Sequence, residues 1–121
     1  MSRKFYACSG LLIAVLAAAA PAFAAYIDLL KDSPISYFTE EDQEIFNKTL
    51  KDTLNDGADG ETRTWSNSNT GASGEMTALG TFDRNGLTCR TLSVINNADG
   101  LSATRKFTFC KTEPGEWKIA D

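Results

Sequence analysis

The sequence predicts an α+β domain in which one N-terminal amphipathic helix packs on one face of an antiparallel meander sheet of about five strands. Three observations support this fold class: a helical apolar period after Thr39, shorter periods with recurrent turn residues beyond Gly60, and two cysteines that one hairpin register would pair. We expect three segments, namely a signal peptide over residues 1–24, an N-terminal segment over residues 25–38 and the α+β domain over residues 39–121.

The first 24 residues have the composition of a secretory signal peptide. Arg3 and Lys4 are followed by an apolar stretch that ends at Ala20, and a small-x-small motif ends at Ala24. A transmembrane anchor is the alternative, but even the longer run from Leu11 to Ala25 has only 15 residues and is broken by Pro21, whereas a spanning helix needs roughly 20. We therefore expect cleavage after Ala24 and a mature chain without a transmembrane span.

Charge and composition exclude several classes of function. The chain contains no His, which excludes Ser–His and Cys–His catalysis and His-ligated zinc sites. Removal of Arg3 and Lys4 with the signal peptide leaves 10 basic against 16 acidic residues, a net charge of −6. Nucleic-acid binding normally uses a basic face, so we expect no nucleic-acid partner and favour basic ones. We expect the exported chain to be periplasmic or secreted, with peripheral outer-membrane association as an open alternative.

A single helix is predicted over residues 39–54. Thr39 can cap its start, the acidic residues 40–42 complement the positive end of the helix dipole, and residues 55–57 end it. The apolar half of the helical wheel contains Ile45, Phe46, Thr49, Leu50, Thr53 and Leu54. The charged residues occupy the other half, so we expect the helix to bury one side and to expose the other to solvent.

Five strands are predicted beyond Gly60, because runs rich in Thr, Val, Ile and Phe alternate with turn residues. Their expected positions are about 62–66, 74–82, 87–97, 102–110 and 117–119. The connections between them are the polar stretch 68–73 and the turns at 84–86, 99–100 and 113–115.

The turn at residues 99–100 predicts the register of one hairpin. A two-residue loop pairs Ala98 with Leu101, and the same register pairs Cys89 with Cys110. If the pair beside the turn is hydrogen-bonded, the cysteines form a non-hydrogen-bonded pair with Cα atoms about 4.5 Å apart, within bridging range. A two-cysteine metal site is the alternative, but it lacks the further ligands that zinc needs. We therefore expect a Cys89–Cys110 disulfide.

This register divides the sheet into an apolar and a polar face. The apolar face is expected to contain Leu92, Val94, Ala98, Leu101, Ala103, Phe107 and Phe109. A three-residue loop at residues 84–86, with Gly86 left-handed, would add Met76, Ala78 and Phe82 to the same face. The opposite face carries both cysteines among Ser and Thr, so we expect it to be polar and solvent-exposed. The helix should cover the apolar face.

An ordered set of Trp, Gly and Cys residues resembles a known family. The set consists of Trp65, Asn67, Gly71, Gly74, Met76 and Thr77, then Cys89-Arg90, Cys110-Lys111, Gly115 and Trp117-Lys118-Ile119. It resembles the C-terminal domain of the seventeen-kilodalton surface antigen family of proteobacterial envelope proteins, over about residues 61–120. The resemblance implies an envelope location and antigenicity, with no established reaction. Better-known members are lipoproteins with a glycine zipper, and because this chain has neither feature, membrane anchoring is not implied.

Four residues are candidates for a binding surface: Trp65, Asn67, Arg90 and Trp117. The two tryptophans either form an aromatic platform for a ligand or anchor the first and last strands in the core. Arg90 and Arg105 fall on the apolar side of the predicted register. They either lie at its rim, with the guanidinium in water or paired with a carboxylate, or mark an anion site. The polar stretch 68–73 is a further candidate contact surface.

We expect a non-catalytic exported envelope protein, a small recognition or structural module that binds an envelope protein or a glycan. The acidic stretch 55–61 resembles part of a twelve-residue calcium-binding loop. The Glu that such a loop needs at its twelfth position is missing here. The carboxylates cluster on the exposed side of the helix and in turns, whereas a glycosidase needs one desolvated carboxyl group. We expect no cofactor and no metal. An exported periplasmic hydrolase or a hydrolase inhibitor is the alternative.

Overall fold

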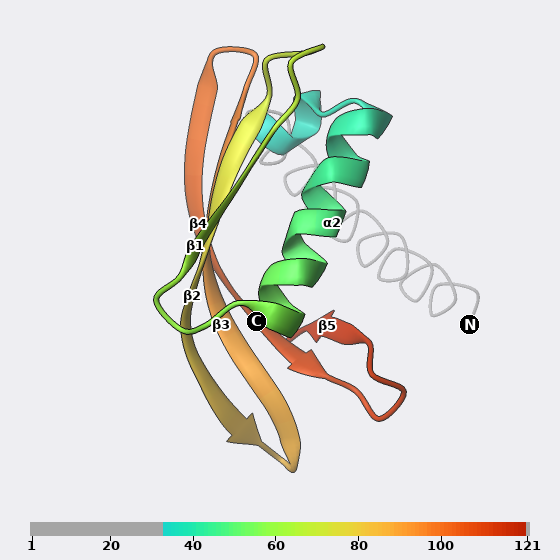
Figure 1. The fold of residues 1–121 in the computed structure, drawn as a ribbon, viewed down its shortest axis with the longest axis vertical. Coiled ribbons are helices and arrows are strands. Elements are labelled where there is room, and N and C mark those ends of the chain that lie inside the picture. Colours follow the sequence, from blue (N-terminus) through green and yellow to red (C-terminus); the bar gives the residue numbers. More distant parts are fainter. Residues whose placement is uncertain (1–32, 121) are drawn as a thin grey trace, which may run out of the picture. The chain divides into compact units, whose positions relative to one another are not determined.

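The structure, a computed structural model, describes residues 33–120 and confirms the predicted fold class (Figure 1). Its elements are the 3₁₀ helix η1 (Pro34–Tyr37), the helix α2 (Glu40–Asp56) and the strands β1 (Thr62–Ser66), β2 (Ser73–Arg84), β3 (Leu87–Ala98), β4 (Leu101–Lys111) and β5 (Trp117–Ile119). The strands form one antiparallel sheet in the order β1-β2-β3-β4-β5, which is the expected meander.

The predicted signal peptide, its cleavage site after Ala24 and most of the segment 25–38 lie outside the described residues. Within residues 33–120, no helix is both long and apolar enough to cross a membrane.

Helix α2 begins with a capping box. The Thr39 hydroxyl accepts a hydrogen bond from the Asp42 backbone N–H at 3.1 Å, and the Thr39 backbone N–H donates to Asp42 Oδ2 at 2.9 Å. The helix ends at Asp56, two residues beyond the predicted end, and the N–H of Gly57 donates to the Thr53 carbonyl. Figure 1 shows that α2 runs along one face of the sheet, where it contacts β1 and β2.

The β3–β4 hairpin has the predicted register. Ala98 pairs with Leu101 across a turn in which Asp99 and Gly100 both have positive φ, 53° and 75°. Cys89 pairs with Cys110 and forms the expected disulfide, with a Cα–Cα distance of 4.0 Å. One short turn thus positions two cysteines that lie 21 residues apart in the sequence.

The prediction for the β2–β3 hairpin is wrong near its turn. Arg84 pairs with Leu87, so the loop has two residues rather than three, and both Asn85 and Gly86 have positive φ. Mirror-image turns of this kind match the twist of the flanking strands, which explains why the shorter loop forms. The register is restored farther along by a β-bulge between Ala78 and Gly80.

The bulge changes which face of the sheet each β2 residue occupies. Met76 pairs with Val94 and is fully buried on the covered face, as expected. Phe82, by contrast, pairs with Cys89 and lies on the open face, because the extra residue reverses the alternation of side chains. The open face is less exposed to solvent than predicted: Cys89 is 0% exposed, and Thr108 is also buried.

The core lies between α2, η1 and the covered face of the sheet. Its buried members are Phe38, Leu54, Trp65, Ala72, Met76, Ala78, Leu92, Val94, Ala98 and Phe109. The rings of Phe38 and Trp65 meet edge to face, with centroids 5.2 Å apart. Trp65 pairs with Gly74 across the strands, and a Cβ at Gly74 would collide with the indole nitrogen. Gly74 is thus required by the ring that packs against it.

Loss of the disulfide should destabilise the domain measurably. In the loop-entropy argument, the closed loop between Cys89 and Cys110 contributes about 3 kcal/mol, which corresponds to a decrease in Tm of roughly 10 °C or more. We expect this decrease for the double variant Cys89→Ser/Cys110→Ser in thermal unfolding followed by circular dichroism.

Reduction of the wild-type protein should give the same decrease, and the double variant should not respond to reductant. Labelling of both thiols by iodoacetamide in the native, non-reduced protein would contradict the pairing.

Candidate functional site

The structure separates the four candidate binding residues. Trp65 and Asn67 lie near the start of α2, Arg90 lies at its end, and Trp117 lies on β5. Trp65 is only 5% exposed and contacts the rings of Phe38 and Phe46, so its ring is part of the core. The four residues therefore do not form one surface.

Asn67 connects the β1–β2 loop to the start of α2. Its amide Nδ2 donates to Asp42 Oδ1 at 2.7 Å, and Thr70 Oγ1 donates to the same oxygen at 2.7 Å. The other oxygen, Oδ2, accepts from the Thr39 backbone. Asp42 is 1% exposed, so a carboxylate is buried with hydrogen bonds to both of its oxygens. Asn67 and Asp42 thus hold the polar loop against the helix.

The hydrogen bonds determine the ionisation of Asp42. Burial by itself would raise the pKa of this carboxyl group, but the hydrogen bonds from the Thr39 backbone, Thr70, Asn67 and the Thr39 side chain together lower it below its ordinary value. The sequence contains a signal for this arrangement, because Thr39 and Asp42 have the spacing of a capping box. The distant partner Asn67 has no such signal.

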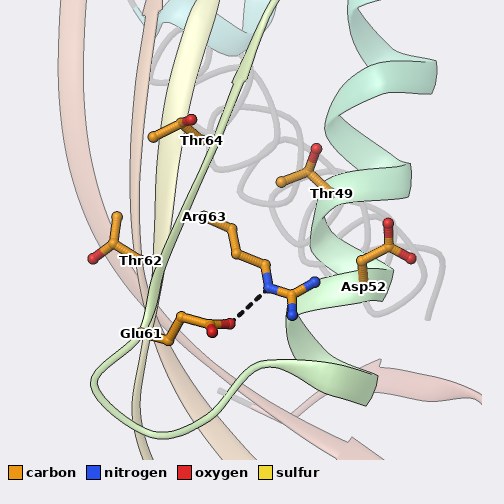
Figure 2. Close-up of a pocket in the computed structure, with 6 residues that line it drawn as sticks. All are labelled: Thr49, Asp52, Glu61, Thr62, Arg63 and Thr64. Carbon is orange, nitrogen blue, oxygen red and sulfur yellow. Dashed lines mark hydrogen bonds and ion pairs between the residues drawn. The ribbon is translucent and has the colours of Figure 1, made fainter.

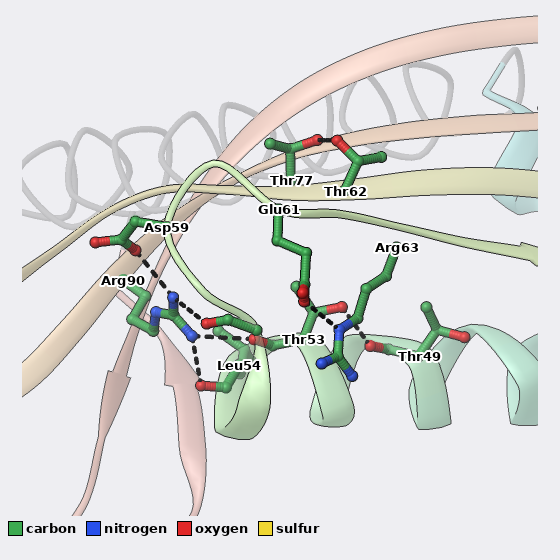
Figure 3. A network of polar contacts seen from close by, with 10 residues as sticks. Thr49, Thr53, Leu54, Asp59, Glu61, Thr62, Arg63, Thr77 and Arg90 are labelled. Carbon is green, nitrogen blue, oxygen red and sulfur yellow. Dashed lines mark hydrogen bonds and ion pairs between the residues drawn. The ribbon is translucent and has the colours of Figure 1, made fainter.

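Arg90 occupies the other end of α2 (Figure 3). The side chain of Arg90 is only 8% exposed, and it donates five hydrogen bonds. Nη1 donates to the carbonyl oxygens of Thr53 at 3.0 Å and Leu54 at 2.9 Å, Nη2 donates to the Gly57 carbonyl at 2.7 Å and Asp59 Oδ1 at 2.9 Å, and Nε donates to Thr81 Oγ1 at 2.9 Å. Arg90 therefore caps the C-terminal end of the helix from strand β3.

This geometry decides between the alternatives for Arg90. The guanidinium does not lie in water, and because its five N–H donors are all engaged, none remains for a bound anion. Pairing with a carboxylate is the alternative that the structure contains, through Asp59. The Arg90 hydrogen bond is also the first cause of a lowered pKa at Asp59. Arg105, in contrast, is exposed.

A polar depression lies between α2 and β1 (Figure 2). Its lining residues are Thr49, Asp52, Glu61, Thr62, Arg63 and Thr64. Arg63 Nε donates to Glu61 Oε1 at 2.9 Å, and this hydrogen bond raises the pKa of Arg63. The ion pair is partly exposed at both members, so it contributes little to stability. This depression is therefore a solvent-exposed gap between the side chains of α2 and β1.

An apolar groove lies between the C-terminal half of α2 and the hairpin that ends in β5. Its lining residues are Asn47, Leu50, Lys51, Leu54, Phe109, Gly115, Glu116 and Trp117, and its volume is about 350 Å³. Trp117 Nε1 donates to Asn55 Oδ1 at 2.8 Å, which sets the position of the ring. Lys111 Nζ lies 5.9 Å from the ring centroid. Trp117 is thus the candidate residue that lines an open groove.

Replacement of Arg90 should destabilise the domain without opening a large cavity. Arg90→Lys retains the charge but cannot reach three carbonyl groups and two side chains at once, which leaves buried acceptors unpaired. We expect a loss of about 2–4 kcal/mol in the free energy of unfolding, measured by urea denaturation.

Arg105→Lys is the matched control, because Arg105 is exposed on the same side of the neighbouring strand. It should change stability by less than about 0.5 kcal/mol. Equal stabilities of the two variants would contradict a capping role for Arg90.

Asp42 should make the stability of the domain depend on pH in the acid range. Its pKa is lower in the folded state than the value of about 3.9 in an unfolded chain, so its contribution is complete above that value and is lost as the pH falls through the folded-state pKa. We expect Asp42→Asn to lower stability at pH 7 and to reduce the loss of stability on acidification, measured by denaturation at several pH values.

The control for Asp42 is Glu44→Gln, on the exposed side of the same helix. An unchanged pH dependence in Asp42→Asn would show that other carboxyl groups, such as Glu41 or Asp59, carry the effect.

Most of the residues described above lie in a segment that a known protein family shares. A sequence model of a family described as 17 kDa outer membrane surface antigen matches residues 52–118. No curated protein and no solved structure is significantly similar to the chain. The matched segment contains the last turn of α2, nearly the whole sheet, the disulfide and Arg90. The chain therefore belongs to the 17 kDa outer membrane surface antigen family.

Proposed function

We propose that this envelope protein is a non-catalytic recognition module that binds its ligand in the groove beside Trp117. The groove itself is the main support: Leu50, Leu54 and Phe109 supply apolar lining, and Trp117 adds an aromatic ring. Ligand sites commonly combine apolar and aromatic walls with a few polar groups. Here Lys51 and Glu116 supply charged groups among the lining residues.

The carboxyl groups support a non-catalytic role. A general acid that works near neutral pH needs a raised pKa, whereas the pKa shifts resolved for Glu41, Asp42 and Asp59 are all downward. Asp42, the buried one, has hydrogen bonds to both oxygens from its own domain. These carboxylates are therefore suited to holding the structure together.

The groove favours a ligand with a flat, partly apolar group. A sugar ring can stack on an indole, and an aromatic or aliphatic side chain of another envelope protein can fill the same space. We propose that the mature protein, which begins at Ala25 after removal of the signal peptide, is located in the periplasm or at the periphery of the outer membrane. Family membership and the predicted signal peptide support this location.

Trp117→Ala should weaken capture of the ligand strongly. In a cross-linking pull-down from intact envelopes, we expect the wild-type protein to recover one stoichiometric protein or glycan partner. Removal of a central aromatic contact typically costs at least about 2 kcal/mol, so the affinity of the variant should fall roughly thirtyfold. Ile119→Ala is the matched control, because Ile119 is 65% exposed on the same strand and does not line the groove.

Two results would contradict the proposal. One is retention of the same partner by folded Trp117→Ala, which would place binding elsewhere. The other is turnover of peptidoglycan or peptide by the purified protein, if a single carboxylate substitution abolished it.

A further inference from the structure

Strand β4 is paired on both sides along only part of its length. β3 pairs with β4 from Leu101 to Cys110, whereas β5 pairs only with Phe109, Cys110 and Lys111. Among residues 33–120, no strand pairs with β4 between Leu101 and Phe107 on the side away from β3. Figure 1 shows β5 beside one end of β4, while the other end runs on to the β3–β4 turn. Beyond the three residues that pair with β5, this edge of β4 therefore has no neighbouring strand in the described part of the chain.

The turn shows which peptide groups point outward from this edge. Ala98 and Leu101 flank a two-residue turn and form a hydrogen-bonded pair, and pair types alternate along the ladder. The N–H and C=O groups of Ser102, Thr104 and Lys106 consequently face away from β3. The Ala120 N–H confirms this alternation independently, because it donates to the carbonyl of Thr108, two residues beyond Lys106, at 2.7 Å.

The free edge is basic in a protein that is acidic overall. Arg105 and Lys106 are exposed and adjacent, so they lie on opposite faces of the sheet. Their cross-strand partners on β3 are Val94 and Ser93, neither of which is charged. Arg105 Nη1 lies 3.5 Å from the Thr104 carbonyl oxygen, at the outward side of the strand. The charges therefore stand beside the peptide groups that an added strand would use.

A second copy of this chain fits the edge poorly. An antiparallel pair of two β4 edges would bring Arg105 and Lys106 close to the same residues of the other copy, and like charges across a ladder are unfavourable. Lysine and arginine on edge strands commonly prevent such self-pairing. An incoming strand with carboxylates would instead gain a favourable pair on each face.

We propose that the free edge of β4, from Leu101 to Phe107, accepts an extended acidic segment of a partner protein as an additional strand. The segment bonds to the peptide groups of Ser102, Thr104 and Lys106, as in strand addition to an exposed sheet edge. Two consecutive carboxylates lie opposite Arg105 and Lys106, one on each face. This surface is separate from the groove beside Trp117, so the two proposals can fail independently.

The test uses a synthetic heptapeptide, Thr-Val-Thr-Glu-Glu-Val-Thr, and a control peptide in which both Glu are replaced by Lys. We expect the acidic peptide to bind the purified, oxidised protein and to slow amide hydrogen exchange at Ser102, Thr104 and Lys106. Exchange at Ala103 and Arg105 should not change, because their N–H groups already face β3. Protection that does not alternate, or no protection, would overturn the proposal.

Charge reversal tests the specificity. The double variant Arg105→Glu/Lys106→Glu should bind the acidic peptide about tenfold more weakly and should prefer the Lys peptide, because two favourable cross-strand pairs become unfavourable. The variant Trp117→Ala should bind the acidic peptide as the wild type does. Equal affinity of the charge-reversed protein for both peptides would contradict the acidic specificity.

Backbone blocking distinguishes strand addition from attraction between side chains. Thr104→Pro removes an outward N–H, which edge strands tolerate, and should abolish binding. N-methylation of the peptide provides the same test without altering the protein. Methyl groups on the amides that face β4 should abolish binding, and methyl groups on the alternate amides should not. Equal binding of the two methylated peptides would overturn the proposal.

Discussion

The interaction on which the rest of the structure depends is made by the guanidinium group of Arg90, which binds the C-terminal end of α2 to the central strand of the sheet. The last carbonyl groups of a helix have no partner within the helix, and those of Thr53, Leu54 and Gly57 all accept from Arg90. Arg90 belongs to β3, the central strand, so one side chain satisfies the helix end and sets its position on the sheet. Arg rather than Lys is suited to this role, because its planar fork presents five donors.

A second buried charge holds the opposite end of the helix. Asp42 receives hydrogen bonds from the helix start and from the β1–β2 loop, through Thr39, Asn67 and Thr70. The carboxylate complements the positive end of the helix dipole, and the guanidinium complements the negative end. Between these two contacts the apolar side of α2 packs on Trp65 and its neighbours. Hydrophobic packing is non-directional, so it does not by itself fix how α2 lies on the sheet. The polar contacts at the two ends of the helix fix its direction and its position along the strands.

The residues that carry the family resemblance are mostly parts of this scaffold. Trp65 packs over Gly74, Asn67 binds Asp42, and Cys89-Arg90 combines the disulfide with the helix cap. Such residues explain why the chain folds, but each one is already engaged in contacts within the domain. The two surfaces that we propose for recognition lie outside most of this set, in the groove beside Trp117 and along the edge of β4. A shared fold therefore does not by itself define a shared ligand.

The sequence by itself determined the fold class, the helix, the number of strands and the Cys89–Cys110 pairing, because these depend on local periodicity, capping residues and a two-residue turn. It did not determine the face occupied by Phe82, since one bulged residue reverses the side-chain alternation and has no clear local signal. Only the tertiary structure decided that Arg90 and Asn67 are structural, whereas Trp117 lines an open groove. Their partners on α2 lie at least 25 residues away in the sequence, and contacts over that separation arise only when the helix docks on the sheet.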